Sequence, residues 1–216
     1  MTPKDIASGL RLLIYDDTCK GGRAKIGLTH SWWIGGSFYR RIGRFDGVCA
    51  AHSWHEALHF LNTFETTRSI DEIQFWGHGK WGEARISMDI LDIHSLKRKS
   101  PLFTDLQGVA KRLKGPDSRF WFRTCETFGA EKGHAFATAF ATFMNCLVAG
   151  HTYIIGPWQS GLHCLKPGET PDWPVDEGVR EGTPEEPARA FWSRPGRNHT
   201  ITCLQDRIPK KWTAAL

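Results

Sequence analysis

The feature that most constrains the fold of this sequence is the alternation of short apolar runs with longer segments of helical periodicity. The run LRLLIY at residues 10–15 is typical of a strand that is buried on both faces of a parallel sheet. Three further short runs predict strands at residues 73–76, 119–124 and 146–149. Apolar side chains at helical spacing predict helices at residues 53–65, 104–113 and 131–145. This order predicts an α/β fold with a mainly parallel sheet sandwiched by helices.

Length and composition place these elements in a single domain that spans residues 1–216. The chain has 216 residues, of which 40% are hydrophobic and 24% charged, and these are ordinary values for a globular domain. We expect the core of this domain to cover about residues 10–155. The Pro-rich and acidic stretch that follows predicts an irregular C-terminal cover over residues 156–216, with a closing strand at residues 200–204. Residues 31–45 predict either a hairpin or an ordered loop.

Charge and hydropathy limit the partners that we expect. The formal net charge is +5, and the basic residues are scattered in short groups between acidic ones, so we expect no nucleic-acid partner. No run approaches the ~20 apolar residues of a membrane span, so we expect no membrane partner. Residues 1–15 lack the features of a secretory signal, which predicts a cytoplasmic protein. The six cysteines form no CxxC pair, so we expect free thiols, one of which is reactive.

Chemically capable side chains follow two of the predicted strands. Trp76-Gly77-His78-Gly79 ends one strand, and Arg123-Thr124-Cys125-Glu126 ends the next. Because the carboxyl ends of parallel strands share one edge of a sheet, we expect His78 and Cys125 to share that edge. A thiolate, an imidazole and backbone N–H groups are the minimum set for acyl transfer by a cysteine nucleophile. The alternative is a histidine in a turn and a small buried cysteine.

Two segments of the sequence resemble the caspase-like clan of cysteine peptidases, which includes caspases, metacaspases, gingipains and separase. They are IDEIQFWGHGKWGEARIS and RFWFRTCETFGAEKGHAFATAFATFMNCLVAG, and the likeness covers roughly residues 10–155. It is closest to a bacterial caspase-like domain of unassigned function. Residues 31–45 and 156–216 lie outside it. The resemblance implies a caspase-like fold for the core.

The resemblance also implies a function, namely a cysteine endopeptidase that acts on a protein or peptide substrate and needs no cofactor. Cys125 would be the nucleophile, and His78 would be the acid that protonates the leaving amine. The backbone N–H groups of Gly79 and Cys125 would hold the oxyanion. The alternative is a binding or regulatory module that keeps the fold without turnover, and the reactivity of Cys125 would distinguish the two.

Three residues are candidates for binding the substrate. The clan often lines its specificity pocket with the residue two positions before the nucleophile, which is Arg123 in this sequence. A guanidinium offers a forked donor to a carboxylate, so we expect cleavage after acidic residues. The alternative is an Arg123 that pairs with a structural acid such as Glu126. Trp76 and Trp158 would form walls of a substrate groove, unless they pack the tail over the sheet.

A rival motif lies in the helix predicted at residues 53–65. The segment His55-Glu56-Ala57-Leu58-His59 matches HExxH, in which two histidines bind zinc and the glutamate acts as a general base. Its apolar residues fall on one side of a helical wheel, however, and His55, Glu56 and His59 fall on the other. This pattern is typical of an ordinary surface helix, so a zinc-dependent hydrolase is the less favoured alternative.

A last candidate is the acidic pair Asp16 and Asp17 after the first predicted strand. It would either bind a cation or end the strand with a turn, and we favour the turn.

Overall fold

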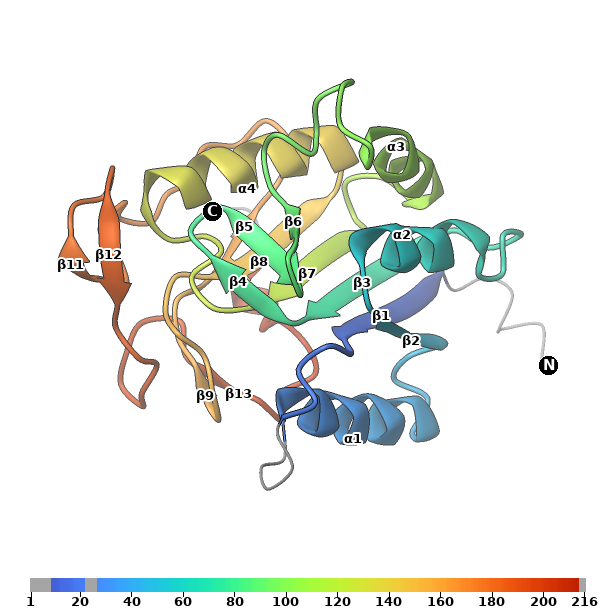
Figure 1. The fold of residues 1–216 in the computed structure, drawn as a ribbon, viewed down its shortest axis with the longest axis horizontal. Coiled ribbons are helices and arrows are strands. Elements are labelled where there is room, and N and C mark those ends of the chain that lie inside the picture. The colour runs from blue at the N-terminus through green and yellow to red at the C-terminus, as the bar shows by residue number, and fades with distance from the viewer. Residues whose placement is uncertain (1–8, 22–26, 214–216) are drawn as a thin grey trace.

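A six-stranded sheet forms the centre of the computed structural model, which describes residues 9–21 and 27–213 (Figure 1). The strand order is β10-β8-β7-β3-β1-β2, and every neighbouring pair is parallel except β10 with β8. The strands are β1 (Leu10–Asp16), β2 (Gly47–Ala51), β3 (Ile70–Trp76), β7 (Arg119–Arg123), β8 (Leu147–His151) and β10 (Leu162–Leu165). The predicted α/β class with a mainly parallel sheet is therefore confirmed.

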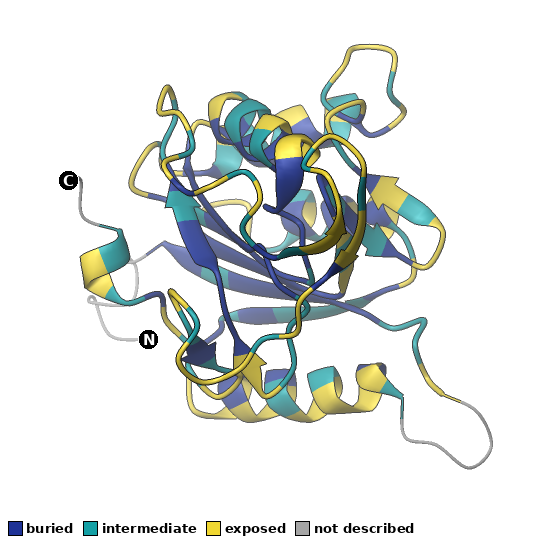
Figure 2. Ribbon diagram, turned by 90° about the vertical axis from the view of Figure 1, so that its left-hand side faces the viewer, coloured by how far each residue is buried: buried dark blue, intermediate teal, exposed yellow. Residues whose placement is uncertain are grey.

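Helices cover both faces of this sheet. Figure 1 shows helices both above and below the sheet. The upper helices are α2 (Trp54–Thr63), α3 (Phe103–Arg112) and α4 (Ala130–Met144), and the lower helix is α1 (Leu28–Arg41). The side chains of β1 point alternately to the two faces of the sheet. Leu12 and Ile14 belong to the core under the upper helices, whereas Leu13 and Tyr15 belong to the core beside α1. The central strands are buried on both faces and are dark blue in Figure 2. This burial explains why their sequences are continuous apolar runs.

Helix α2 begins after Ser53, as its sequence predicts, and ends at Thr63, two residues before the predicted end. The Ser53 hydroxyl accepts a hydrogen bond from the backbone N–H of Glu56 and so caps the first turn. Trp54, Ala57 and Leu58 are buried on the face toward the sheet. The predicted helices at residues 104–113 and 131–145 are likewise present as α3 and α4.

The prediction of a hairpin or loop at residues 31–45 is wrong, because most of this segment belongs to helix α1. Its contact face consists of small or polar residues, namely Thr29 and Gly36, together with Tyr39. A Cβ on Gly36 would lie 3.0 Å from Leu13 Cδ2, so the glycine lets the helix approach the sheet closely. The large apolar residues Trp33 and Phe38 are instead exposed.

The C-terminal region contains more regular structure than the predicted irregular cover. Strand β10 extends the main sheet, and the region adds β9 (Trp158–Gln159), β11 (Val179–Gly182), β12 (Pro187–Ala190), β13 (Ile201–Thr202) and the 3-10 turn η1 (Lys210–Trp212). The closing strand exists as β13, but it pairs with β9 and not with the main sheet. Ile201 and Ile208 pack on Trp121 and cover the part of the lower face that α1 leaves open.

A small antiparallel sheet begins directly after the end of β3. It consists of β4 (His78–Lys80), β5 (Glu83–Ile86) and β6 (Asp89–Leu91). Gly77 separates β3 from β4, so His78 lies two residues beyond the end of β3 and is the first residue of the small sheet. No helix among the described residues is long and apolar enough to cross a membrane. The expectation of no secretory signal falls partly on residues 1–8, which lie outside the described residues.

Candidate functional site

His78 and Cys125 occupy equivalent positions at one edge of the sheet. Strands β3 and β7 are parallel neighbours, and the last pair in their register is Trp76 with Arg123. His78 and Cys125 each lie two residues beyond that pair. The structure therefore brings these two residues to one edge, as strand order and spacing predict, while their side chains take different directions.

Gly79 holds the segment after His78 close to the turn that carries Cys125. A Cβ at Gly79 would lie 2.2 Å from Thr127 Oγ1 and 2.7 Å from the carbonyl oxygen of Cys125. Only glycine leaves room for that approach. The turn itself is tightly bonded, because the Thr124 and Thr127 hydroxyls lie 2.6 Å apart and Thr127 donates to the carbonyl of Glu83. The role of Gly79 and Cys125 as oxyanion donors stays a prediction.

The thiol of Cys125 faces backbone atoms on the other side of the turn. Its sulfur accepts a hydrogen bond from the N–H of Ile155 at 3.4 Å and lies 3.9 Å from the Ile155 carbonyl oxygen. Burial raises the pKa of Cys125 to about 11, and the Ile155 N–H offsets only part of this effect. The next residue, Glu126, has a φ of 58°, a left-handed conformation that costs energy in a non-glycine residue. Cys125 is thus a protonated thiol beside a strained turn.

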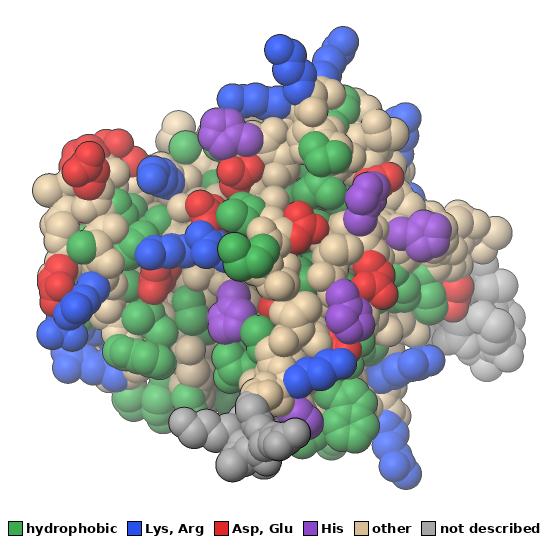
Figure 3. Space-filling model, viewed as in Figure 1, with side chains coloured by type: hydrophobic (Ala, Val, Ile, Leu, Met, Phe, Trp, Pro, Cys, Tyr) green, Lys and Arg blue, Asp and Glu red, His purple; other side chains and the backbone are tan. Residues whose placement is uncertain are grey.

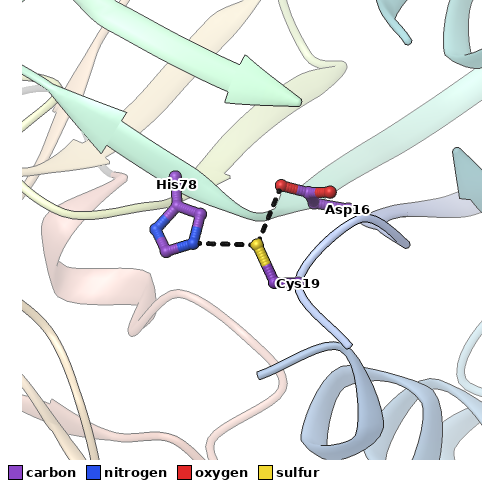
Figure 4. Close-up of side chains that lie close together, drawn as sticks. All are labelled: Asp16, Cys19 and His78. Atoms are coloured by element: carbon purple, nitrogen blue, oxygen red, sulfur yellow. Dashed lines mark hydrogen bonds between the residues drawn. The ribbon is translucent and has the colours of Figure 1, made fainter. Parts of the chain in front are cut away.

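The cysteine that His78 contacts is Cys19. The His78 Nε2 atom lies 3.1 Å from Cys19 Sγ, and Cys19 Sγ lies 3.6 Å from Asp16 Oδ2 (Figure 4). Asp16 is the last residue of β1, and Cys19 lies on the loop that leads from β1 toward α1. The ring of Trp32 on α1 meets His78 edge-on, with centroids 5.8 Å apart.

The loop that carries Cys19 is fixed at both ends. Asp16 Oδ1 accepts hydrogen bonds from the backbone N–H and the hydroxyl of Thr18, at 2.8 and 2.6 Å. This is the turn that the sequence favours after the first strand. On the other side, the Thr29 hydroxyl accepts from the Cys19 N–H and donates to the Asp16 carbonyl. The positions of the carboxylate and the thiol are therefore set by the fold.

The electrostatics around Cys19 oppose its ionisation. Burial and the nearby Asp16 carboxylate both raise the pKa of the Cys19 thiol. In a catalytic triad the carboxylate orients the imidazole. Here the carboxylate instead contacts the sulfur, so Asp16 disfavours a free thiolate at this position.

Arg123 is buried without a carboxylate partner. Its Nε and Nη2 donate to Gln159 Oε1, and Nη2 also donates to the carbonyl of Cys203 at 2.9 Å. The guanidinium carbon lies 5.2 Å from the ring centroid of Trp76 and 4.6 Å from that of Trp121. In the described part of the chain no acidic side chain forms an ion pair with Arg123, and Nη1 has no hydrogen-bond partner. Burial lowers the pKa of Arg123 to about 10.

The two tryptophans expected at a substrate groove differ in their surroundings. Trp76 is buried beside Tyr39 and Phe45, and its indole N–H donates to Gln74 Oε1. Trp158 on β9 is 41% exposed. Trp158 thus has surface to offer a ligand, whereas Trp76 contributes to the core. Their role in substrate binding stays a prediction.

The HExxH residues lie on the exposed side of α2, as the helical wheel predicts. His55 Nδ1 pairs with Asp105 at 2.9 Å, and Glu56 accepts from the backbone N–H of His52. Across the described ranges, the only group of three or more His, Cys, Asp or Glu side chains with converging ligand atoms is Asp16, Cys19 and His78. The HExxH segment therefore gains no third ligand from the described residues.

The sequence predicts a turn or a cation site at Asp16, but it does not predict the contact between Cys19 and His78. Strand β1 is the other neighbour of β3, so its carboxyl end lies at the same sheet edge as those of β3 and β7. This placement brings Asp16 and Cys19 close to His78. The contact could not follow from a motif, because 59 residues separate Cys19 from His78.

No protein-family model matches the sequence, and a search of curated proteins finds no match either.

Proposed function

We propose that this chain is a cysteine hydrolase of the caspase-like kind that cleaves peptide bonds through Cys125 and His78. The observation that carries the proposal is the shared register of the two residues, each two positions beyond the last pair of two parallel strands. The mainly parallel sheet with helices on both faces and the close packing of Gly79 on the Cys125 turn are consistent with it.

The chemistry needs two side-chain movements. His78 has to leave Cys19, and the Cys125 thiol has to leave the Ile155 backbone. In the reaction, His78 takes the proton of the Cys125 thiol, and the thiolate forms a bond to the carbonyl carbon of the substrate. The C–N bond then breaks as His78 gives that proton to the amine nitrogen. Water then hydrolyses the thioester, which releases the carboxylic acid product and restores the thiol. Substrate binding is the step that would induce the movements.

Arg123 supports a preference for acidic residues on the acyl side of the cleaved bond. Its hydrogen-bond partners are the neutral oxygens of Gln159 and Cys203, and Nη1 has none among the described residues. Because Arg123 is buried beneath Gln159 and the Cys203 carbonyl, a substrate carboxylate would have to displace these oxygens, and it would then supply the missing opposite charge. The test is to profile cleavage by the Arg123→Glu variant after acidic and basic residues. An unchanged profile would remove Arg123 from substrate selection.

The activity is tested by labelling with a peptidyl acyloxymethyl ketone that carries Asp next to the ketone. The adduct is located by mass spectrometry in the wild type, in His78→Ala and in Cys19→Ser. We expect an adduct at Cys125 that is lost in His78→Ala and kept in Cys19→Ser. An adduct at Cys19 alone would assign the nucleophile to Cys19 and overturn the assignment to Cys125.

A second candidate, a binding module without turnover, is favoured by the resting state of both thiols. The Cys125 sulfur is engaged by Ile155, and His78 is engaged by Cys19. If iodoacetamide labels all accessible thiols equally in the wild type and in His78→Ala, and the ketone labels none, then the binding module replaces the peptidase.

A further inference from the structure

We propose that Asp16, Cys19 and His78 form a binding site for a borderline-soft divalent cation such as Zn²⁺. The three residues offer a carboxylate oxygen, a sulfur and an imidazole nitrogen that all lie within 4.8 Å of one another. Figure 4 shows the Cys19 thiol between the other two side chains, on the loop that follows β1.

The two distances from the Cys19 sulfur to the other ligand atoms are close to those of tetrahedral coordination. Zinc bonds of about 2.0–2.3 Å at tetrahedral angles place neighbouring ligand atoms about 3.3–3.7 Å apart. The Sγ–Oδ2 distance of 3.6 Å falls in this range, and the Sγ–Nε2 distance of 3.1 Å needs only a small rotation of His78. His78 is exposed, so a fourth position is open to water or to an added ligand.

The buried carboxylate of Asp16 is a second observation that points to a cation. Asp16 is 0% exposed, and its Oδ1 is already satisfied by two hydrogen bonds from Thr18. Among the described residues, the hydrogen-bond partner of Oδ2 is the Cys19 thiol, which is a weak donor. Thr18 therefore orients the carboxylate as outer-shell partners orient metal ligands, with Oδ2 aimed into the site.

The donor set selects the class of cation. Thiolate and imidazole ligands suit Zn²⁺ and related transition metals, while Ca²⁺ and Mg²⁺ require oxygen ligands. On binding, the Cys19 S–H bond breaks, the sulfur bonds to the metal, and the proton goes to solvent. The thiolate, the Asp16 carboxylate and a neutral His78 then carry two negative charges, which balance the two positive charges of the ion.

Occupation of this site also has a consequence that rests on the proposed function. The metal would take the Nε2 lone pair of His78 and hold the ring beside Cys19, so His78 could not serve Cys125. The cation would thus act as an inhibitor, and chelation would release His78.

The binding test uses Co²⁺, which reports its own ligands through a thiolate charge-transfer absorption. We expect the purified chain to bind one Co²⁺ with this absorption and with the visible bands of a tetrahedral ion, and Zn²⁺ to displace it. Cys19→Ser and His78→Gln should weaken Co²⁺ binding by about 100-fold or more, since loss of an outer-shell partner alone costs about 10–100-fold. Circular dichroism of each variant establishes that it is folded.

Two matched controls separate this site from adventitious binding. Cys203→Ser removes an exposed thiol, and the double variant His55→Gln with His59→Gln removes the imidazoles of α2. Both should keep the thiolate absorption and the affinity for Co²⁺. The proposal is overturned if the folded wild type shows no thiolate absorption, if the absorption survives in Cys19→Ser, or if it is lost in either control.

The inhibitory consequence is measured separately. Zn²⁺ at saturation should reduce labelling of Cys125 by the ketone to the level of His78→Ala, and a chelator should restore it. Equal labelling of Cys125 with and without Zn²⁺ would overturn the proposed inhibition. The existence of the metal site would still be judged from the cobalt spectrum. If no labelling occurs with or without metal, it is the proposed peptidase that fails.

Discussion

His151 is a fully buried histidine at the end of β8 whose ring has one satisfied nitrogen. Its Nδ1 lies 3.1 Å from the carbonyl oxygen of Ser160, so Nδ1–H donates to that oxygen, and Nε2 has no partner among the described residues. Burial, and to a smaller extent the charge of Arg123, lowers the pKa of His151 to about 3. The native state therefore holds a neutral imidazole that would be charged in mild acid if it were exposed.

This histidine predicts a loss of stability in mild acid. The folded pKa is about 3 and the ordinary value is 6.5, so the unfolded chain binds the proton first as the pH falls. The free energy of unfolding should drop by about 2 kcal/mol between pH 6.5 and 5, at about 1.4 kcal/mol per pH unit. Urea unfolding at the two pH values measures the drop.

The variant His151→Asn keeps a donor toward Ser160 and removes the titration, so its stability should change less with pH than that of the wild type. His59→Asn changes an exposed histidine on α2 and is the matched control. An equal pH dependence in wild type and His151→Asn would contradict the assignment.

At the scale of elements, predictability depends on which residues form the contact face of each helix. α2 and α4 present Leu and Phe to the sheet, so their periodicity is visible in the sequence. α1 presents Thr29 and Gly36 and exposes its large apolar residues, so its pattern does not show which face is buried. The same limit applies to β4, whose position depends on a close approach at Gly79.

We predict that Gly79→Ala disturbs the site by moving β4 away from the Cys125 turn. The new Cβ would meet Thr127 Oγ1 at 2.2 Å and the Cys125 carbonyl at 2.7 Å, and overpacking of this kind costs about 1–3 kcal/mol. Thermal and urea unfolding measure the loss. Gly156→Ala is the control, since nothing lies within 4 Å of its Cβ, and it should leave stability nearly unchanged. Equal stability of the two variants would contradict this packing.

At the scale of the whole molecule, the sheet has two different covers on its lower face. α1 covers β1 and β2, while the C-terminal region covers the strands on the other side of β3. The backbone carbonyls of residues 203–206 accept hydrogen bonds from four side chains, namely Tyr39, Arg44, Gln74 and Arg123. Acidic and basic side chains are interspersed over the face in Figure 3, as the scattered charges of the sequence predict.

The sequence could not reveal that the C-terminal region accepts these hydrogen bonds, because every residue has a backbone carbonyl and no residue type marks one as an acceptor. Its prolines and acids favour an irregular loop, and the short strand β10 has only 4 residues. The placement of His78 and Cys125 at one sheet edge could be predicted, because the ends of the strands can be read from the sequence. The contact between His78 and Cys19 could not be predicted, because it depends on the path of the loop after β1.

We predict that the C-terminal region is an integral part of the stability of the fold. Leu162→Ala truncates a fully buried side chain that packs with Trp121, and it should cost about 2–5 kcal/mol in the free energy of unfolding. Leu204→Ala is the matched control, because Leu204 is 80% exposed and its loss should change stability by less than about 0.5 kcal/mol. A similar small effect of both would show that the region is a dispensable appendage.

The bonds from residues 203–206 also have a consequence for synthesis on the ribosome. A nascent chain emerges from its amino-terminal end, so the strands of the central sheet leave the exit tunnel well before these carbonyls do. Until then Arg44 and Arg123 lack acceptors that they have in the native state, and Trp121 lacks its cover of Ile201 and Ile208. Completion of this fold therefore waits until residues 201–208 have left the exit tunnel.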